Sequence, residues 1–196
     1  MTYARWLRAG TALVAALCLG ACAATEPLPQ FYLLTPSIPD SARSRSGPSL
    51  YVQRVQVPTY LARNNLVTIR GGNRVDYARS ARWAEPPDQG ISRMVAEGLN
   101  RTTHVRAMSF TPGAPPGSYA YSVQIRLQRF EGTDRGEVIL AAHYDVFTLD
   151  STEPIASRHF ETRRSGWHPG DYAGLTRLLS DELMEMSRAI ARALRK

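Results

Sequence analysis

His143 and Asp145 come closest, of all residues in this chain, to a pair with acid/base or metal-binding chemistry. They lie two positions apart in an apolar segment of strand composition, so both side chains would point to the same side of a strand. An imidazole beside a carboxylate can exchange protons near neutral pH or share a metal ion. Same-side His and Asp residues on strands more often form cross-strand hydrogen bonds, and we expect that structural role here.

The rest of the sequence offers no stronger catalytic candidate. The four histidines are His104, His143, His159 and His168. None has a carboxylate or a second histidine four residues away, the spacing that joins two side chains on one face of a helix. Patterns such as Gly-x-Ser-x-Gly, His-Glu-x-x-His and a phosphate loop are missing from the sequence. The sequence therefore predicts a protein that is not an enzyme and has no metal site and no cofactor.

Trp83 and Glu85 form a second constellation, because an aromatic and an acidic residue directly ahead of a helix could contact a partner protein. The structural alternative is that Trp83 fills the corner between a hairpin and the helix. Glu85 would then lie near the positive end of the helix dipole and stabilise it. We favour the structural role and keep the pair as the candidate partner contact.

Cys22 is the residue for which the sequence predicts a covalent modification. Arg5 and Arg8 precede an apolar run that starts near Ala12, which is the order of a secretory signal. The run is shorter than the roughly 20 apolar residues that span a bilayer. It ends in Leu19-Gly20-Ala21-Cys22, which looks like the lipobox of bacterial lipoproteins.

Lipidation would make residues 1–21 a signal peptide, Cys22 the first mature residue and 22–30 a lipidated tether with Pro27 and Pro29. The sulfur of Cys22 would become a thioether, so it could serve neither as nucleophile nor as metal ligand. The alternative is an ordinary signal peptide that is cut after Ala24. Removal of 1–21 leaves 22 basic and 17 acidic side chains, a formal charge of +5. An exported protein does not meet nucleic acid, so this charge favours a lipid or protein partner.

The remainder, 31–196, is expected to form one α+β domain: a mixed, largely antiparallel sheet with two helices packed on one face. The hairpin is the clearest element, because two strand-like runs flank Gly71-Gly72-Asn73. Strands are predicted over 31–34, 50–57, 66–70, 74–78, 105–110, 121–128, 138–149 and 156–162, and helices from 88 to about 100 and from 171 to the end. The last helix carries an apolar stripe of Leu175, Leu178, Leu179, Leu183, Met186, Ile190 and Leu194, which must be buried.

Several short segments, in order along the chain, resemble the PqiC family, the ABC-type transport auxiliary lipoproteins. They are Phe31-Tyr32-Leu33-Leu34, Val57-Pro58-Thr59-Tyr60-Leu61-Ala62-Arg63, the hairpin, Arg82-Trp83-Ala84-Glu85-Pro86 and Met186-Ser187-Arg188-Ala189-Ile190-Ala191. The chain departs from the family pattern at Ala62, Asn64, Asn65 and Pro87.

The resemblance implies a lipoprotein on the periplasmic face of the outer membrane. It would act as a docking component for a PqiB-like MCE-domain protein and its inner-membrane transporter, in the movement of lipids between membranes. The family is not known as enzymatic, and the oligomeric state stays open. Two alternatives are a periplasmic lipid-binding carrier, in which the sheet and helices enclose an acyl chain, and a periplasmic hydrolase using His143 and Asp145.

Overall fold

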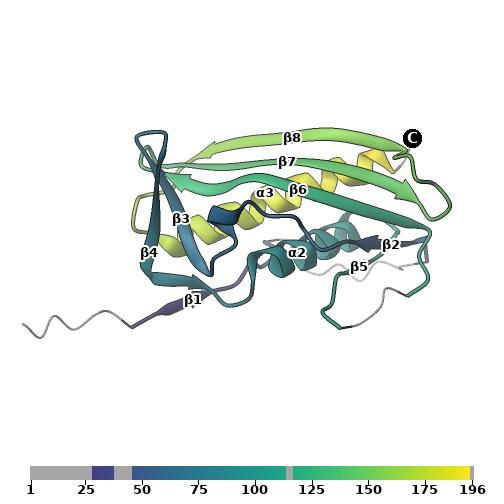
Figure 1. The fold of residues 1–196 in the computed structure, drawn as a ribbon, viewed down its shortest axis with the longest axis horizontal. Coiled ribbons are helices and arrows are strands. Elements are labelled where there is room, and N and C mark those ends of the chain that lie inside the picture. Colours follow the sequence, from purple (N-terminus) through teal and green to yellow (C-terminus); the bar gives the residue numbers. More distant parts are fainter. Residues whose placement is uncertain (1–27, 38–45, 114–116, 195–196) are drawn as a thin grey trace, which may run out of the picture.

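Strand β6 (Tyr121–Thr133) is the strand to which most of the sheet is joined. The computed structural model describes residues 28–37, 46–113 and 117–194, and these contain eight strands in one sheet and two α-helices (Figure 1). The other strands are β1 (Gln30–Tyr32), β2 (Ser49–Val52), β3 (Asn65–Arg70), β4 (Arg74–Trp83), β5 (Arg106–Ser109), β7 (Glu137–Thr148) and β8 (Ala156–Ser165). The helices are α2 (Pro87–Thr102) and α3 (Tyr172–Ala193), with a 3-10 turn at Thr59–Leu61. The predicted α+β class is confirmed.

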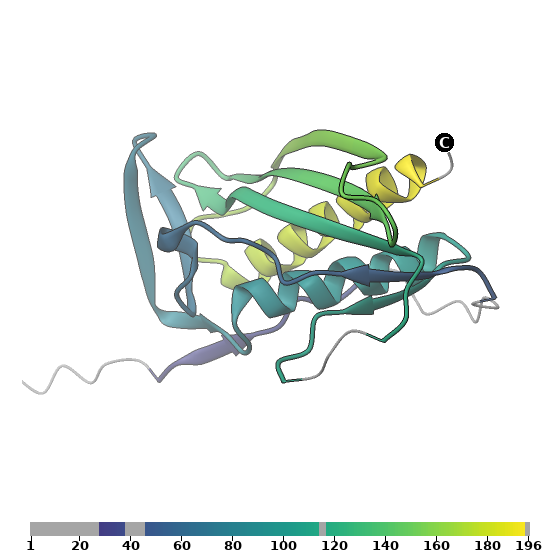
Figure 2. The ribbon, with the colours of Figure 1, turned by 45° about the vertical axis from the view of Figure 1, so that its right-hand side comes forward.

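The two edges of β6 are used differently. One edge pairs antiparallel with β7, which pairs antiparallel with β8. The other edge is shared, because β2 runs parallel to the start of β6 and β3 runs parallel to its end. β3 continues into the predicted antiparallel hairpin with β4, while β1 and β5 add parallel to β4 and β2. The hairpin and the β2–β5 pair therefore lie at opposite ends of the molecule (Figures 1 and 2).

A bulge in β6 keeps its apolar side chains on one face. Leu127 and Phe130 are both buried although they are three residues apart, which strict alternation would place on opposite faces. The register with β7 shifts between Leu127 and Arg129, and this extra residue restores the alternation. The strand predicted over 50–57 is shorter than expected: β2 ends at Val52, and only Gln56 returns to bridge Arg126.

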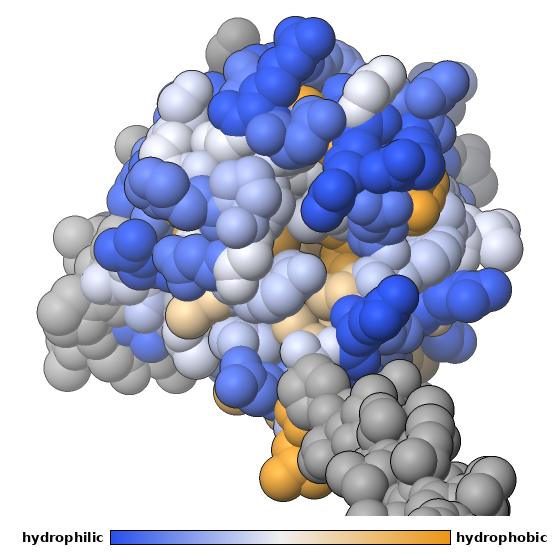
Figure 3. Space-filling model, turned by 90° about the vertical axis from the view of Figure 1, so that its left-hand side faces the viewer, coloured by the Kyte–Doolittle hydropathy of each residue, from blue (hydrophilic) through white to orange (hydrophobic). Residues whose placement is uncertain are grey.

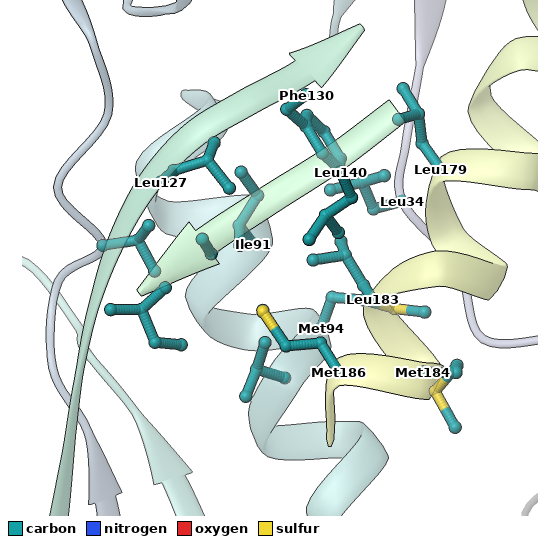
Figure 4. Packing of buried hydrophobic residues seen from close by; sticks show 14 of the residues in the cluster. Leu34, Ile91, Met94, Leu127, Phe130, Leu140, Leu179, Leu183, Met184 and Met186 are labelled. Atoms are coloured by element: carbon teal, nitrogen blue, oxygen red, sulfur yellow. The ribbon is translucent and has the colours of Figure 1, made fainter. Parts of the chain in front are cut away.

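Helix α3 buries the predicted stripe. Asp171 caps its start by accepting a hydrogen bond from the Gly174 backbone amide at 2.8 Å. Leu175, Leu179, Leu183, Met186 and Ile190 are at most 1% exposed, and Leu178 and Leu194 are partly buried. Labelled side chains from both helices meet those of β6 and β7 in one layer (Figure 4).

Both helices lie on one face of the sheet and contact each other. α3 lies against β6, β7 and β8, whereas α2 lies against β2 and β5. At their crossing Gly98 of α2 faces Ser187 of α3, since a Cβ added at Gly98 would lie 2.6 Å from the Ser187 Cβ. Neither of the described helices is long and apolar enough to cross a membrane.

Candidate functional site

Cys22 and the lipobox residues Leu19, Gly20 and Ala21 lie outside the described residues, the first of which is Leu28. Their acylation, and the division into signal, tether and domain, stay predictions. The structure does describe where the predicted tether joins the sheet. β1 begins at Gln30 and pairs with β4. Leu28 and Phe31 are 85% and 66% exposed there, so this end of the domain carries uncovered apolar side chains.

The structure brings His143 and Asp145 together on the face of the sheet that the helices do not cover. His143 Nε2 lies 3.1 Å from Asp145 Oδ1 and 2.9 Å from Ser157 Oγ. The Ser157 hydroxyl donates to the same carboxylate oxygen at 2.6 Å, while Arg126 Nη2 lies 2.8 Å from the other one. Side chains from β6, β7 and β8 thus form one polar network.

This network lacks the geometry of a hydrolase triad. In a triad the histidine uses one ring nitrogen for the nucleophile and the other for the carboxylate. Here Ser157 and Asp145 contact the same nitrogen, and the Ser157 hydroxyl donates to the carboxylate, so the imidazole does not activate it. Burial alone would raise the pKa of Asp145, but hydrogen bonds from Ser157 and Arg126 outweigh it and hold the pKa below its ordinary value. The geometry supports the cross-strand structural role.

Trp83 occupies the corner between the hairpin and α2. It is 7% exposed, and its ring stacks on Phe130 with the centroids 6.0 Å apart. Solvent reaches little of the indole, so of the two predicted contact residues Glu85 is the more accessible one.

Glu85 is held by an arginine of α2. Arg93 Nε donates to Glu85 Oε1 at 3.1 Å, and Arg93 Nη2 donates to the same oxygen at 2.5 Å. The guanidinium also reaches the Leu34 carbonyl at 2.9 Å and Glu97 at 3.0 Å. Arg93 therefore ties Glu85, at the entry of α2, to the segment after β1. A partner contact through Glu85 stays a prediction.

Glu131 is one of the buried carboxylates that the sequence analysis missed. The strand predicted over 121–128 continues to Thr133 as β6, so Glu131 lies within the strand, where it is 1% exposed. Tyr60 OH donates to Glu131 at 2.9 Å, Arg129 Nε at 2.6 Å and the Phe130 amide at 2.7 Å. Burial and the neighbouring carboxylate both raise the pKa of Tyr60 above its ordinary value. The nearest signal in the sequence is Tyr60 in the segment 57–63, which gave no indication of its partner.

The hairpin end of the molecule is mostly hydrophilic. A hollow of about 640 Å³ there is lined by both hairpin strands and by Tyr172. Arg70 and Asp76 beside it form an ion pair at 2.6 Å. Hydrophilic side chains cover most of this end and surround a small apolar area (Figure 3). Across the described parts of the chain, no three His, Cys, Asp or Glu side chains are arranged to hold a metal ion.

Comparison with known proteins places nearly all of the folded region in one family. The sequence profile of the ABC-type transport auxiliary lipoprotein component matches residues 32–191. The intermembrane transport lipoprotein PqiC of Escherichia coli K12 is 27% identical over 133 residues, which are 67% of this chain and 70% of that protein. PqiC of Shigella flexneri matches with the same values.

Two crystal structures share the fold. One, of an uncharacterized protein, has a TM-score of 0.71 at 21% identity and covers 86% of this chain and 99% of its own. The other, of a Xanthomonas campestris protein, has a TM-score of 0.67 at 16% identity and covers 83% of this chain and 92% of its own. At these identities the likeness concerns the fold alone. Because the family profile spans nearly all the described helices and strands, the chain belongs to the PqiC family of ABC-type transport auxiliary lipoprotein components.

Proposed function

We propose that the protein is the membrane-anchored docking component of an MCE-type system that moves lipids between the two membranes. The observation that carries the proposal is the family match over residues 32–191, together with the PqiC relatives named as intermembrane transport lipoproteins. In this role the folded domain binds an MCE-domain protein, and that protein connects it to the inner-membrane transporter.

The anchor of this component is Cys22, and its site is the periplasmic face of the outer membrane. Ala23 follows the cysteine, where enterobacterial lipoproteins retained in the inner membrane have aspartate. The apolar side chains of Leu28, within the predicted tether, and of Phe31 and Leu33, directly after it, are 85%, 66% and 46% exposed. Apolar side chains at that position suit a domain whose first strand rests close to a bilayer.

The role requires no catalysis. The only His and Asp pair suggested by the sequence is part of a structural network, in which the hydroxyl of Ser157 is bonded to Asp145. A variant carrying His143→Ala with Asp145→Ala should therefore support transport wherever it accumulates as folded protein. A double variant that is folded but does not support transport would favour the hydrolase alternative.

The direct test is co-purification with an MCE-domain protein of the same organism. A version that begins at Ala23, and so has no anchor, should still bind that partner in vitro. The matched control keeps residues 1–30 and replaces the domain with an unrelated periplasmic protein, so it has the anchor alone. Binding by the control, or none by the version that begins at Ala23, would contradict docking through the folded domain.

A further inference from the structure

Edge strand β8 and helix α3 run side by side, and the charges along their seam differ between its two ends. Near the end of β8, Arg164 Nε lies 2.5 Å from Oε1 of the buried Glu182, so opposite charges close the seam. Near the start of β8, Arg158 and Arg192 line one pocket from opposite walls. The C-terminal end of α3 lies beside this part of β8 (Figures 1 and 2). Like charges therefore face this pocket from both sides.

The pocket has an apolar floor and a volume of about 330 Å³. The pocket is lined by Ala156, His159 and Phe160 of β8 and by Ala189 and Ala193 of α3. Ile155, which also lines it, is 51% exposed. Among the described residues that line it there is no carboxylate. Its surface thus combines two guanidinium groups with side chains that suit hydrocarbon.

Neither arginine is neutralised by the protein. Arg158 Nη1 donates to the Ser157 carbonyl at 2.9 Å, and no carboxylate within the described ranges pairs with Arg158 or Arg192. Arg192 lies in the last turn of α3, where a cation offsets the partial negative charge of the helix end. An anion entering the pocket is therefore met by cations rather than by bare helix carbonyls.

Tyr144 lines the same pocket as the two arginines. Its side chain is 4% exposed, and none of the hydrogen bonds within the described part of the chain involves its hydroxyl. Burial raises the pKa of Tyr144, whereas Arg158 and Arg192 both lower it. Its hydroxyl is thus available as a further hydrogen-bond donor among the residues that line the pocket.

We propose that this pocket binds the phosphate of a phospholipid between Arg158 and Arg192, with the adjoining glycerol and first methylenes on the apolar floor. A bound phosphate would offset the repulsion between the two cations. Each guanidinium group can also donate two parallel hydrogen bonds to phosphate oxygens. The volume lies at the low end of the roughly 300–1,000 Å³ of small-molecule sites, so it admits a headgroup region and not a whole lipid. The need for an anion and an apolar group comes from the pocket alone, while the choice of a phospholipid rests on the proposed function.

The test is native mass spectrometry of the full-length protein in a nonionic detergent. Phosphatidylglycerol, diacylglycerol with the same acyl chains, and inorganic phosphate serve as the three probes. We expect one phosphatidylglycerol per protein, much weaker binding of diacylglycerol and weak binding of phosphate alone. If diacylglycerol bound as tightly as phosphatidylglycerol, the pocket would not be an anion site. If inorganic phosphate bound as tightly as phosphatidylglycerol, the ligand would not be a lipid.

Variants locate the binding. Arg158→Gln and Arg192→Gln should each weaken phosphatidylglycerol binding by about tenfold, the loss expected for one charge-assisted hydrogen bond. Ala189→Phe should weaken it by filling the floor without a change of charge. The control is Arg177→Gln, which changes an exposed arginine of the same helix outside the pocket. An unchanged melting temperature shows that Arg158→Gln and Arg192→Gln are folded. Unchanged binding of phosphatidylglycerol by these two folded variants would overturn the proposal.

The lipid and docking proposals fail separately, because lipid binding is measured with no transport partner present. If the protein bound phosphatidylglycerol but did not bind the MCE-domain protein, the result would count against the docking proposal alone. The reverse result would count against the lipid pocket alone.

Discussion

On the face of the sheet that the helices do not cover, three donors hold the carboxylate of Glu131 where solvent does not reach. A buried charge is tolerated only when such partners are present, and loss of one partner leaves part of the cost of burial uncompensated. Tyr60 joins Glu131 from the segment after β2. The pair therefore ties that segment to β6.

Tyr60→Phe should lower the free energy of unfolding by about 1 to 2 kcal/mol near neutral pH, since it removes a hydrogen bond to a charged acceptor. The pKa of Tyr60 is raised in the folded state above its ordinary value of 10.0, so the protonated phenol is the form that folding favours. This stabilisation is complete below about pH 10 and is lost as the pH rises above that value.

Urea unfolding at pH 8 and above pH 10 measures this difference. The difference in the free energy of unfolding between wild type and Tyr60→Phe should be smaller above pH 10 than at pH 8. Tyr32→Phe is the control, because Tyr32 bonds Gln30 in an exposed position. A free-energy difference that stays constant with pH would contradict the conclusion that the protonated phenol of Tyr60 stabilises the fold.

Asp145→Asn should abolish part of the acid sensitivity of the fold. The pKa of Asp145 is held below its ordinary value of 3.8 in the folded state. Its ionised form therefore contributes stability that is complete above about pH 4 and is lost as the pH falls below it. The free energy of unfolding should differ less between wild type and Asp145→Asn at pH 3 than at pH 7. Asp150→Asn, in the exposed turn after β7, should leave the pH profile unchanged.

At the scale of elements, α3 provides most of one wall of the core. Leu179 is 1% exposed and Leu183 is fully buried. Leu179→Ala or Leu183→Ala should each cost about 2 to 5 kcal/mol. For a domain of this size that is a fall in melting temperature of roughly 5 to 15 °C. Arg177→Ala, on the exposed side of the same helix, should change the melting temperature little. Equal effects from the three variants would mean that the stripe is not the buried face.

The crossing of α2 and α3 depends on the absence of a side chain at Gly98. A Cβ there would lie 2.4 Å from Ser187 Oγ and 2.6 Å from Ser187 Cβ, and the latter is held by the helix backbone. Gly98→Ala gains about 1 kcal/mol of helix propensity, but overpacking costs about 1 to 3 kcal/mol. We expect a net loss of stability. Adding Ser187→Gly should show coupling in a double-mutant cycle, and strictly additive effects would argue against this contact.

At the scale of the whole molecule, the predicted anchor limits where the domain can act. Eight residue steps separate Cys22 from Gln30, the first residue of β1. At about 3.3 to 3.6 Å per extended residue they reach at most about 30 Å. A domain on this tether stays beside its membrane, so on the docking proposal the partner must span the periplasm.

Replacing the lipoprotein signal with a plain secretion signal should therefore abolish transport in cells while leaving partner binding in vitro intact. Cys22→Ser in the full chain should give an unlipidated precursor of higher apparent mass with the same transport defect. Fractionation of the wild type should place it in the outer membrane. Transport by the unanchored protein would favour a diffusible carrier over a docking component.

Periodicity and turn chemistry determined most of the elements, because these signals are local. Gly71 and Gly72 both have positive φ in the predicted hairpin, and the spacing from Leu175 to Ile190 identified the buried face of α3. Short motifs spread along the chain also identified the family. The end of β6 was less accurate, because Glu131 there is held in part by Tyr60 from a distant segment, and a local pattern carries no information about such a partner.

Only the tertiary structure decided which residues from distant segments meet. The sequence did not show that β2 and β3 share one edge of β6, that Ser157 joins His143 and Asp145, or that Arg158 and Arg192 line one pocket. Each of these contacts depends on strand order, on register and on how α3 lies along β8. Strand order and register follow from the combined free energy of all pairings and of the core, whereas the composition of a segment reports only on that segment.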